Sequence, residues 1–286
     1  MRRLACLALA ACCCASPAFA QATTTNVQMP SPDEVANKDM FTVALGGAWV
    51  PDYEGSNDYR LIPAAALRGK VGGISFTTRG TYLYVDVLNP GSGKLDLDLG
   101  PIAGARFNRT KHHLKDDVVD LLPTRKTAVE VGGFAGVSFH GLTNPYDTLA
   151  VRFDAVHDVG NAHESTTFSP NLDFSTPLSR RTYASLSVGA EFVANKFADY
   201  YFSVSPADSL ATGGVLPVFN ADGGMKNWKA NLLLNQSVTG DLLGGLSVFG
   251  NLGYSRLVGD FKRSPLVSQR GSASQWLLAA GLAYTF

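Results

Sequence analysis

The last eleven residues of the chain, Trp276 to Phe286, read WLLAAGLAYTF. In a strand, successive side chains point to opposite faces, so every second residue shares a face. Here that face would hold Trp276, Leu278, Ala280, Leu282, Tyr284 and Phe286. No polar tail follows Phe286. The stretch therefore predicts a strand with a broad apolar face that runs to the end of the chain.

The same alternation recurs along the chain from Met40 onward. In KLDLDLGPIAGARF, Leu95, Leu97 and Leu99 oppose Asp96 and Asp98. Charged or polar residues oppose apolar ones in the same way at 129–140, 149–154, 185–192 and 228–235. An exported β-sandwich also alternates, but soluble strands usually run about 5–6 residues. Several segments here keep the pattern for about 10 residues, the length that a tilted strand needs to cross a bilayer. The pattern favours an all-β fold, a closed antiparallel transmembrane β-barrel.

Twelve strands are expected, an even number, as in single-chain bacterial barrels. They are 40–50, 58–69, 72–88 with a bend at Gly80, 94–108, 126–140, 147–157, 164–176, 182–194, 198–205, 226–238, 243–257 and 273–286. Because a barrel has no free edge, the last strand should pair with the first, through Phe41, Val43, Leu45 and Trp49. Both ends of the chain should lie at the periplasmic rim. In that count the long connection after the fourth strand would also be periplasmic, against the usual rule of short periplasmic turns.

The N-terminus has the pattern of a secretory signal peptide over residues 1–20. Arg2 and Arg3 precede a short apolar run, and Ala18-Phe19-Ala20 forms a cleavage site of small residues. A lipoprotein signal is the alternative, because Leu9-Ala10-Ala11-Cys12 resembles a lipobox. Residues 21–39 are polar with two prolines and are expected to form a flexible periplasmic leader. The barrel is then residues 40–286.

The cysteine content and net charge argue against a disulfide-stabilised fold and against a nucleic-acid-binding protein. All four cysteines lie between positions 6 and 14, so the exported part has no disulfide. Without Arg2 and Arg3 the chain is slightly acidic, which offers no electrostatic case for binding nucleic acid.

Three ordered motifs resemble those of one family. The first is VPDYEGSNDYRLIP, with Pro51, Tyr53, Gly55, Ser56 and Tyr59; the second is DYYFSVS from Asp199; the third is YSRLVGDFKRSPLV, with Arg256, Asp260, Ser264 and Pro265. Together they resemble the MipA/OmpV family of outer-membrane proteins over essentially the whole exported chain. The last strand also resembles the C-terminal signal of outer-membrane barrels, in which Tyr284 and Phe286 would be recognised by the barrel assembly machinery.

The resemblance implies a barrel in the outer membrane of a Gram-negative bacterium, without catalysis or cofactors of its own. The family is named for a scaffold thought to bring a periplasmic murein lytic transglycosylase together with a murein synthase, so these peptidoglycan enzymes are the implied partners, beside outer-membrane lipid. The leader 21–39 could serve as a tether for such a partner.

The motif residues also have plain structural readings. Pro51 and Gly55 would form a turn, and Tyr53 and Tyr59 could belong to the aromatic girdle at the membrane interface. Ser264 and Pro265 are residue types that favour a turn, which would lie at the outer rim. Alternatively, this segment could dip into the barrel and narrow its lumen. Their role stays open at this point.

Catalysis and metal binding find little support in the residues. His163 and Ser165 have no identifiable third partner for a hydrolase. His112 and His113, near Asp116 and Asp117, would point to opposite faces of a strand, so a solvated loop is favoured over a metal site.

A channel is the main rival to a scaffold. The charges expected to face inward are of both signs: Arg79, Asp96, Asp98, Arg106, Glu130, Arg152, Asp154, Glu191 and Lys229. They fit either ion pairs across a plugged lumen or a narrow pore for small solutes without strong ion preference. We therefore expect a non-enzymatic scaffold barrel, with a narrow outer-membrane channel as the alternative.

Overall fold

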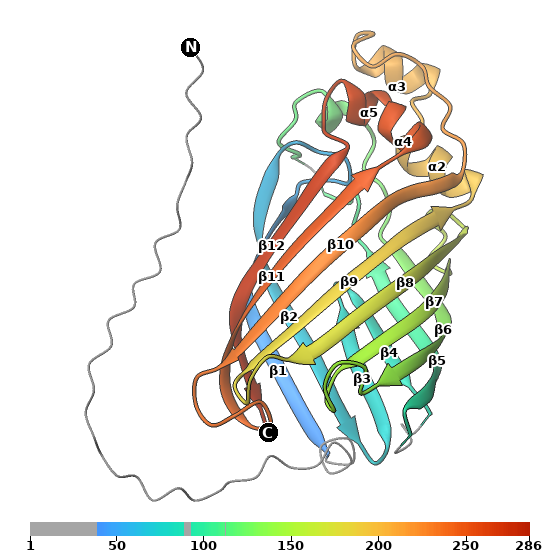
Figure 1. Ribbon diagram of the computed structural model, residues 1–286. Coiled ribbons are helices and arrows are strands. Elements are labelled where there is room, and N and C mark those ends of the chain that lie inside the picture. Colours follow the sequence, from blue (N-terminus) through green and yellow to red (C-terminus); the bar gives the residue numbers. More distant parts are fainter. Residues whose placement is uncertain (1–38, 89–92, 112) are drawn as a thin grey trace, which may run out of the picture.

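The computed structural model describes residues 39–88, 93–111 and 113–286. The expected signal peptide, nearly all of the expected leader and His112 lie outside the described residues. Within the described part, twelve strands form one closed antiparallel barrel in which neighbours in sequence are neighbours in space (Figure 1). The strands are β1 (Met40–Pro51), β2 (Tyr59–Val71), β3 (Ile74–Arg79), β4 (Tyr82–Asp86), β5 (Leu95–Arg106), β6 (Ala128–His140), β7 (Thr148–Asp158), β8 (Thr166–Pro177), β9 (Thr182–Val193), β10 (Gly224–Ser237), β11 (Gly245–Leu257) and β12 (Ser274–Thr285).

Short helices lie between some of these strands. They are the 3-10 turn η1 (Val119–Leu121) and the helices α2 (Asn195–Phe202), α3 (Pro206–Ala211), α4 (Gly259–Arg263) and α5 (Pro265–Ser268). None of the helices in the described residues has the length and apolarity to cross a membrane.

The barrel closes through its first and last strands, as the sequence predicts. In the β1–β12 ladder Val43 pairs with Tyr284, Leu45 with Leu282 and Trp49 with Leu278. The Phe286 N–H donates to the Phe41 carbonyl oxygen at 2.9 Å, and the two rings stack with centroids 6.0 Å apart. The C-terminal Phe286 thus extends the closing seam by one further hydrogen bond.

Two of the predicted strands are wrong, although the total of twelve holds. The segment 72–88 is two strands, β3 and β4, because Gly80 takes a positive φ of 60° and reverses the chain instead of bending it. The segment 198–205 is not a strand, since its first part belongs to helix α2. There Phe197, Ala198, Tyr201 and Phe202 are buried, a helical spacing that places all four on one face.

The corrected count removes the irregular connection. The long segment 107–127 follows the fifth strand, not the fourth, so it lies at the same end as the other long connections. We call this end, which carries 52–58, 107–127, 159–165, 194–223 and 258–273, the loop end. The opposite end, with Met40 and the C-terminus, is the turn end (Figure 1).

The outer face of the wall is apolar along every strand of regular length. Exposed large apolar side chains include Leu45, Leu61, Leu97, Val131, Val151, Leu172, Leu186, Leu232, Leu252 and Leu282. Near the loop end Trp49 stacks on Tyr59 with ring centroids 3.9 Å apart, and Trp276 lies against Tyr254 at 4.7 Å. Phe41, Tyr284 and Phe286 form the matching group at the turn end. An apolar belt between two aromatic girdles is typical of a wall that faces lipid.

A cluster of buried apolar residues lies at the loop end. The cluster gathers Tyr53, Val119, Leu122, Val193, Phe197, Ala198, Tyr201, Phe202, Val204, Leu216, Ala221, Leu257, Phe261, Leu266 and Val267. These residues come from the loops and helices between strands and from the last residues of β9 and β11. The cluster therefore forms a small hydrophobic core across the mouth of the barrel.

Candidate functional site

The loop between β1 and β2 turns inward and is largely buried. Tyr53 is 3% exposed and Ser56 is fully buried. Gly55 has a φ of 100°, a conformation that glycine adopts without strain. A Cβ at Gly55 would lie 2.5 Å from Cγ2 of Val267, so the turn also needs glycine for this close approach.

This loop is hydrogen-bonded to the segment that precedes β12 and to the start of β12 itself. The Gly55 N–H donates to Oε1 of Gln275 at 3.1 Å, and Nε2 of Gln275 donates to the Ser56 carbonyl oxygen at 2.9 Å. The Ser272 N–H donates to the Gly55 carbonyl oxygen at 2.8 Å. The side chain of Gln275 thus satisfies two backbone groups of the turn, which fixes one segment on the other.

Tyr53 links the same two segments from the inside. Its hydroxyl lies 3.4 Å from the Leu266 carbonyl oxygen and 3.3 Å from the Arg270 carbonyl oxygen. Burial, together with the nearby Asp116, raises the pKa of Tyr53 above its usual range, so the hydroxyl stays a donor. The guanidinium of Arg270 in turn pairs with Asp116 at 2.8 Å.

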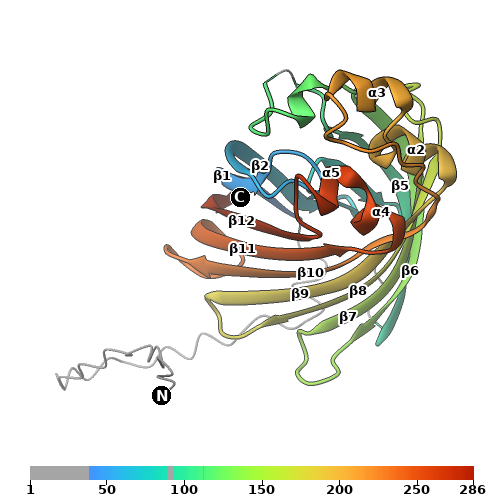
Figure 2. The ribbon, with the colours of Figure 1, turned by 90° about the horizontal axis from the view of Figure 1, so that it is seen from above.

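Helix α2 meets α4 and α5 at the centre of the cluster. The Ser264 hydroxyl, fully buried, donates to the Phe202 carbonyl oxygen at 2.6 Å. The rings of Phe202 and Phe261 pack edge to face with centroids 5.1 Å apart. Figure 2, viewed from above, shows α4 and α5 lying within the outline of the barrel. The three sequence motifs therefore meet in one structure, which we call the cap (residues 52–58, 195–204 and 258–272).

The connection between β5 and β6 holds the cap from the side. The Lys115 N–H donates to Oδ2 of Asp52 at 2.8 Å. Nη2 of Arg109 donates to the Tyr201 carbonyl oxygen at 2.8 Å. Burial and the charge of Arg125 lower the pKa of Arg109 to about 10, which still leaves it charged near neutral pH. The cap is therefore anchored from a fourth segment by two charge-linked contacts.

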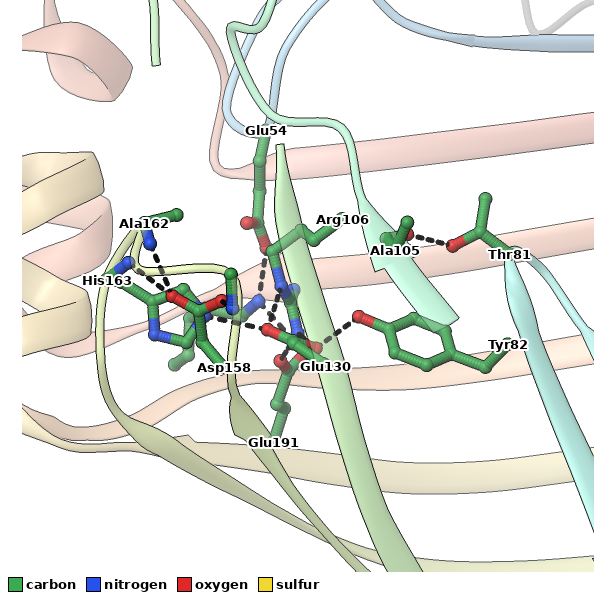
Figure 3. A network of polar contacts seen from close by, with 12 residues as sticks. Glu54, Thr81, Tyr82, Ala105, Arg106, Glu130, Asp158, Ala162, His163 and Glu191 are labelled. Atoms are coloured by element: carbon green, nitrogen blue, oxygen red, sulfur yellow. Dashed lines mark hydrogen bonds and ion pairs between the residues drawn. The ribbon is translucent and has the colours of Figure 1, made fainter. Parts of the chain in front are cut away.

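A buried network of charges lies next to the cap (Figure 3). Nζ of Lys226, only 1% exposed, lies 2.6 Å from Oε1 of Glu54 and 2.9 Å from Oε2 of Glu191. Arg106 continues the chain of ion pairs, with Nη2 3.0 Å from Oε1 of Glu191 and Nε 3.1 Å from Oε1 of Glu130. Five strands or loops are thereby tied together across the barrel interior.

Glu130 is the most enclosed carboxylate of this network. It is fully buried and receives Nε2 of His163 at 2.8 Å and the hydroxyl of Tyr82 in a short hydrogen bond. The ring of His163 lies edge-on against Phe197 of α2, with centroids 4.9 Å apart. The histidine therefore connects the charge network to the apolar core of the cap.

A β-bulge aims Lys226 into this network. Met225 pairs with Phe192 and Asn227 with Glu191, so Lys226 is the extra residue in the ladder. Without the bulge, strict alternation from the outward-facing Trp228 would place the Lys226 side chain on the lipid side. The bulge instead leaves both Lys226 and Asn227 buried.

A second group of ion pairs lies on β3, β7 and β8. Nη1 of Arg152 is 2.8 Å from Oδ2 of Asp173, and its Nε is 2.7 Å from Oδ1 of Asp154. Arg79 reaches the same Asp173 at 3.1 Å. Six of the nine inward charges predicted from the sequence thus take part in ion pairs of the barrel interior: Arg79, Arg106, Glu130, Arg152, Asp154 and Glu191.

The motif residues fall into different places. Ser56, Ser264 and Pro265 are buried in the cap with Tyr53, so Tyr53 is not part of the aromatic girdle, whereas Tyr59 stacks on Trp49 there. Three others sit at the edge of the cap. Pro51 ends β1, Nη1 of Arg256 donates to the Ser274 hydroxyl at 3.1 Å, and Asp260 accepts the Asp222 N–H at 3.0 Å.

Sequence reasoning missed two central residues. Glu54 stands inside the first motif, and Lys226 is the first residue of the predicted strand 226–238, but neither residue has a predicted role. The only sequence signal for Glu54 is that it is an acidic residue in an otherwise turn-like motif. The only signal for Lys226 is that it is a lysine just before the alternation of apolar residues begins.

Two of the residues considered for catalysis or metal binding, His163 and Asp116, contact other charged side chains. Nε2 of His163 contacts Glu130, while Nδ1 of His163 and the hydroxyl of Ser165 have no hydrogen-bond partner among the described atoms. Asp116 binds Arg270. The described residues contain no group of three or more potential metal ligands.

Comparison with known proteins assigns the chain to a family. A sequence profile described as MltA-interacting protein MipA matches residues 43–286. The chain belongs to the MipA family. It is accordingly an outer-membrane β-barrel, in agreement with its closed sheet and apolar outer belt.

Other comparisons give only distant likenesses. No curated protein matches the chain. Among solved structures, an outer membrane channel from Pseudomonas putida F1 is 10% identical, covering 93% of this chain and 99% of that chain, with a TM-score of 0.44. The Pseudomonas putida toluene transporter TodX is 8% identical, covering 92% and 93%, with a TM-score of 0.35. The CymD monoaromatic hydrocarbon channel is 9% identical, covering 89% and 90%, with a TM-score of 0.38.

Proposed function

We propose that this MipA-family barrel is a capped, non-enzymatic interaction protein of the cell envelope. The observation that carries the proposal is the cap itself, in which all three sequence motifs join in one buried core at the loop end. Residues of that core such as Phe197, Val204 and Leu216 are fully buried. Because the motif residues pack across one end of the barrel, they fit a scaffold better than an open pore.

The paired charges of the interior support the same proposal. Lys226, Arg106 and Arg152 each contact two carboxylates. Ion pairs between facing strands fill the interior with fixed side chains and leave few charges free to hold a passing ion. The network would act as a rigid brace beneath the cap.

The family name indicates the partner. The matched family is described as interacting with MltA, and the sequence resemblance implies a murein lytic transglycosylase and a murein synthase. Both act in the periplasm. With both ends of an even-stranded barrel on the periplasmic side, the partner would meet the turn end and the leader 21–39, while the cap faces outward.

A binding experiment tests the scaffold role. The purified full chain in phospholipid vesicles is mixed with a murein lytic transglycosylase, and binding is measured by co-flotation. We expect binding to the full chain, weaker binding when residues 21–38 are removed, and no change when the cap loop 259–268 is shortened. Equal, negligible flotation with all three forms would refute a periplasmic scaffold.

Conductance in planar bilayers tests the alternative, a narrow channel for small solutes. We expect no steady current steps from the unmodified chain or from a control with the turn-end connection 239–244 shortened. Steps should appear only when the cap loop 259–268 is shortened. Steady steps from the unmodified chain would overturn the capped barrel in favour of the channel.

A further inference from the structure

The barrel wall has an interrupted seam beside β2. Among the described residues, ladder pairs join β2 to β3 only from Arg68 to Val71. On its other side β2 pairs with β1 along its whole length, from Tyr59 to Lys70. The hairpin β3–β4 is short, with strands of six and five residues beside neighbours of twelve and thirteen. The half of β2 nearest the loop end, residues 59–66, therefore has no ladder partner on this edge among the described residues, although the Tyr59 carbonyl oxygen accepts a hydrogen bond from Nζ of Lys115 at 2.5 Å.

The free backbone groups on this edge can be identified from one contact. The Leu67 N–H donates to Oγ1 of Thr78 at 2.9 Å, and the same hydroxyl donates to the Leu67 carbonyl oxygen at 3.3 Å. The backbone groups of Leu67 thus face β3. Because these groups alternate in direction along a strand, those of Leu61, Pro63 and Ala65 face the same side. Pro63 has no N–H, so from Leu61 to Ala65 this edge presents three carbonyl oxygens and only two N–H groups.

The interrupted seam lies at membrane depth. Leu61 pairs with Trp49, and Trp49 stacks on Tyr59 in the girdle of the loop end, so Pro63 and Ala65 lie on the membrane side of that girdle. Leu61 is 76% exposed, against 41% for Leu252 in a fully paired part of the wall. In the hydrocarbon region an unpaired backbone group is strongly unfavourable unless a polar partner reaches it.

Behind the seam, the side chains that face the barrel interior are small and apolar. By alternation from the outward Leu61, residues Ile62, Ala64 and Ala66 of β2 face inward. The next strand adds Ala44, Gly46 and Ala48, which lie opposite Ala66, Ala64 and Ile62. The charged network is carried by other strands, chiefly β5, β6, β9 and β10. The interior thus has a short apolar stretch behind residues 62–66. Arg60, which pairs with Asp52, and Arg68 bound this stretch on the same face of β2, and Arg106 of the charge network lies across the seam at the end of β5.

We propose that this seam is a lateral window, bounded by residues 59–66, the tip Gly80-Thr81 and the end of β5, that admits an amphiphile from the lipid phase. The hydrocarbon part fits the apolar outer rim of Leu61 and Phe107, both strongly exposed, and the short apolar stretch of the interior. The polar head bonds the free backbone groups. Because carbonyls outnumber N–H groups there, a head that donates hydrogen bonds, such as an alcohol, is the preferred class.

A strand of another protein is a poorer occupant of the same edge. Strand addition needs backbone donors and acceptors in register along the edge. Pro63 interrupts that register at the middle of the free segment, as prolines do on protected edge strands.

Single-cysteine labelling tests the window, because residues 21–286 contain no cysteine and the unmodified chain supplies the background. Ala64→Cys places a thiol inside the window. Ala279→Cys is the matched control, since Ala279 faces inward from β12 and is paired on both sides, with Ala48 and Asn251. The full chain in outer-membrane vesicles is treated with pyrene maleimide, a lipid-soluble reagent, with dodecanol or dodecane added as competitor. Ala66→Cys replaces Ala64→Cys if the latter is not assembled.

We expect Ala64→Cys to react roughly tenfold faster than Ala279→Cys, because a fully paired wall excludes a lipid-borne reagent. Dodecanol should slow the reaction several-fold, and dodecane should not. Equal rates at the two positions would overturn the window. Reaction that appears only after removal of residues 21–38 would overturn it as well, since the chain's own leader would then occupy the edge. Labelling without protection by dodecanol would refute the amphiphile. None of these results depends on conductance or on a periplasmic partner.

Discussion

Replacing Lys226 by methionine should destabilise the folded barrel. Nζ of Lys226 lies 2.6 Å from Glu54 and 2.9 Å from Glu191, and the side chain is 1% exposed. Removing one partner of a buried ion pair typically costs about 3–5 kcal/mol, because the opposite charge is left without compensation. Arg106 still lies 3.0 Å from Glu191, so Glu54 carries most of the loss. We therefore expect the free energy of unfolding to decrease by about 3 kcal/mol, the lower end of that range.

Urea titration of the refolded barrel in phospholipid vesicles measures this change. The three tryptophans, Trp49, Trp228 and Trp276, are on the lipid-facing side, so their fluorescence reports loss of the membrane-embedded wall. Lys196→Met is the matched control. Its partner Glu164 lies at 3.4 Å, but both side chains are more than half exposed, and such pairs contribute less than about 1 kcal/mol.

A second substitution separates charge from packing. Adding Glu54→Gln to Lys226→Met removes the uncompensated carboxylate and should restore part of the lost stability. If Lys226→Met unfolds at the same urea concentration as Lys196→Met, or if Glu54→Gln makes the variant still less stable, the buried charge network does not brace the barrel as argued.

Three further predictions concern other parts of the molecule. Gly55→Ala should loosen the cap and lower the free energy of unfolding by about 1–3 kcal/mol, because the φ of Gly55 is 100° and an added Cβ would lie 2.5 Å from Val267. Trypsin cleavage at Lys262 and Arg263 should therefore rise. It should not rise in the control Gly72→Ala, where φ is also positive but an added Cβ would meet open space. Deleting Phe286 removes its hydrogen bond to Phe41 and should lower the amount of assembled barrel in outer membranes, while Phe286→Tyr should keep it; normal assembly after deletion would contradict the proposed terminal signal. Burial raises the pKa of Asp147, but hydrogen bonds from Thr143, Leu142 and Asn144 outweigh this and lower it to about 2. The turn is therefore stabilised at pH values above 3.8, the ordinary pKa of an aspartate, and loses that stabilisation as pH falls toward 2. Acid titration should show this loss in the unmodified chain and a smaller one in Asp147→Asn.

The alternation of residues was sufficient to predict the barrel, its closure and most strand positions. It failed where local chemistry interrupts the period. Gly80 reverses the chain inside an otherwise continuous pattern, and the aromatic residues of α2 are common in strands but are spaced for a helix. The two errors compensated in the count, so an even number alone could not reveal them.

The site was harder to predict than the fold. Gly55 and Gln275 are 220 positions apart, and Ser264 and Phe202 are 62 positions apart, so no local pattern announces their contact. The resemblance to a family singled out the right segments but not their roles. Turn residues such as Gly55 have the same appearance in a solvent-exposed turn and in a buried one, and only the tertiary contacts distinguish the two.

One short turn connects the cap to the charge network, and this connection defines how the loop end can move. Tyr53 and Gly55 contact the segment before β12, while Glu54 between them pairs with Lys226. The bulge at Lys226 interrupts the pairing of β9 with β10, and it places the Lys226 side chain in contact with Glu54. Displacing the cap must therefore either separate a buried ion pair or carry Lys226 with it. It follows that Lys226→Met should also raise trypsin cleavage within α4, because the substitution removes the side-chain pairs with Glu54 and Glu191 but keeps the backbone bond from the Val258 N–H to the Lys226 carbonyl oxygen. Unchanged cleavage would show that the cap and the network are independent.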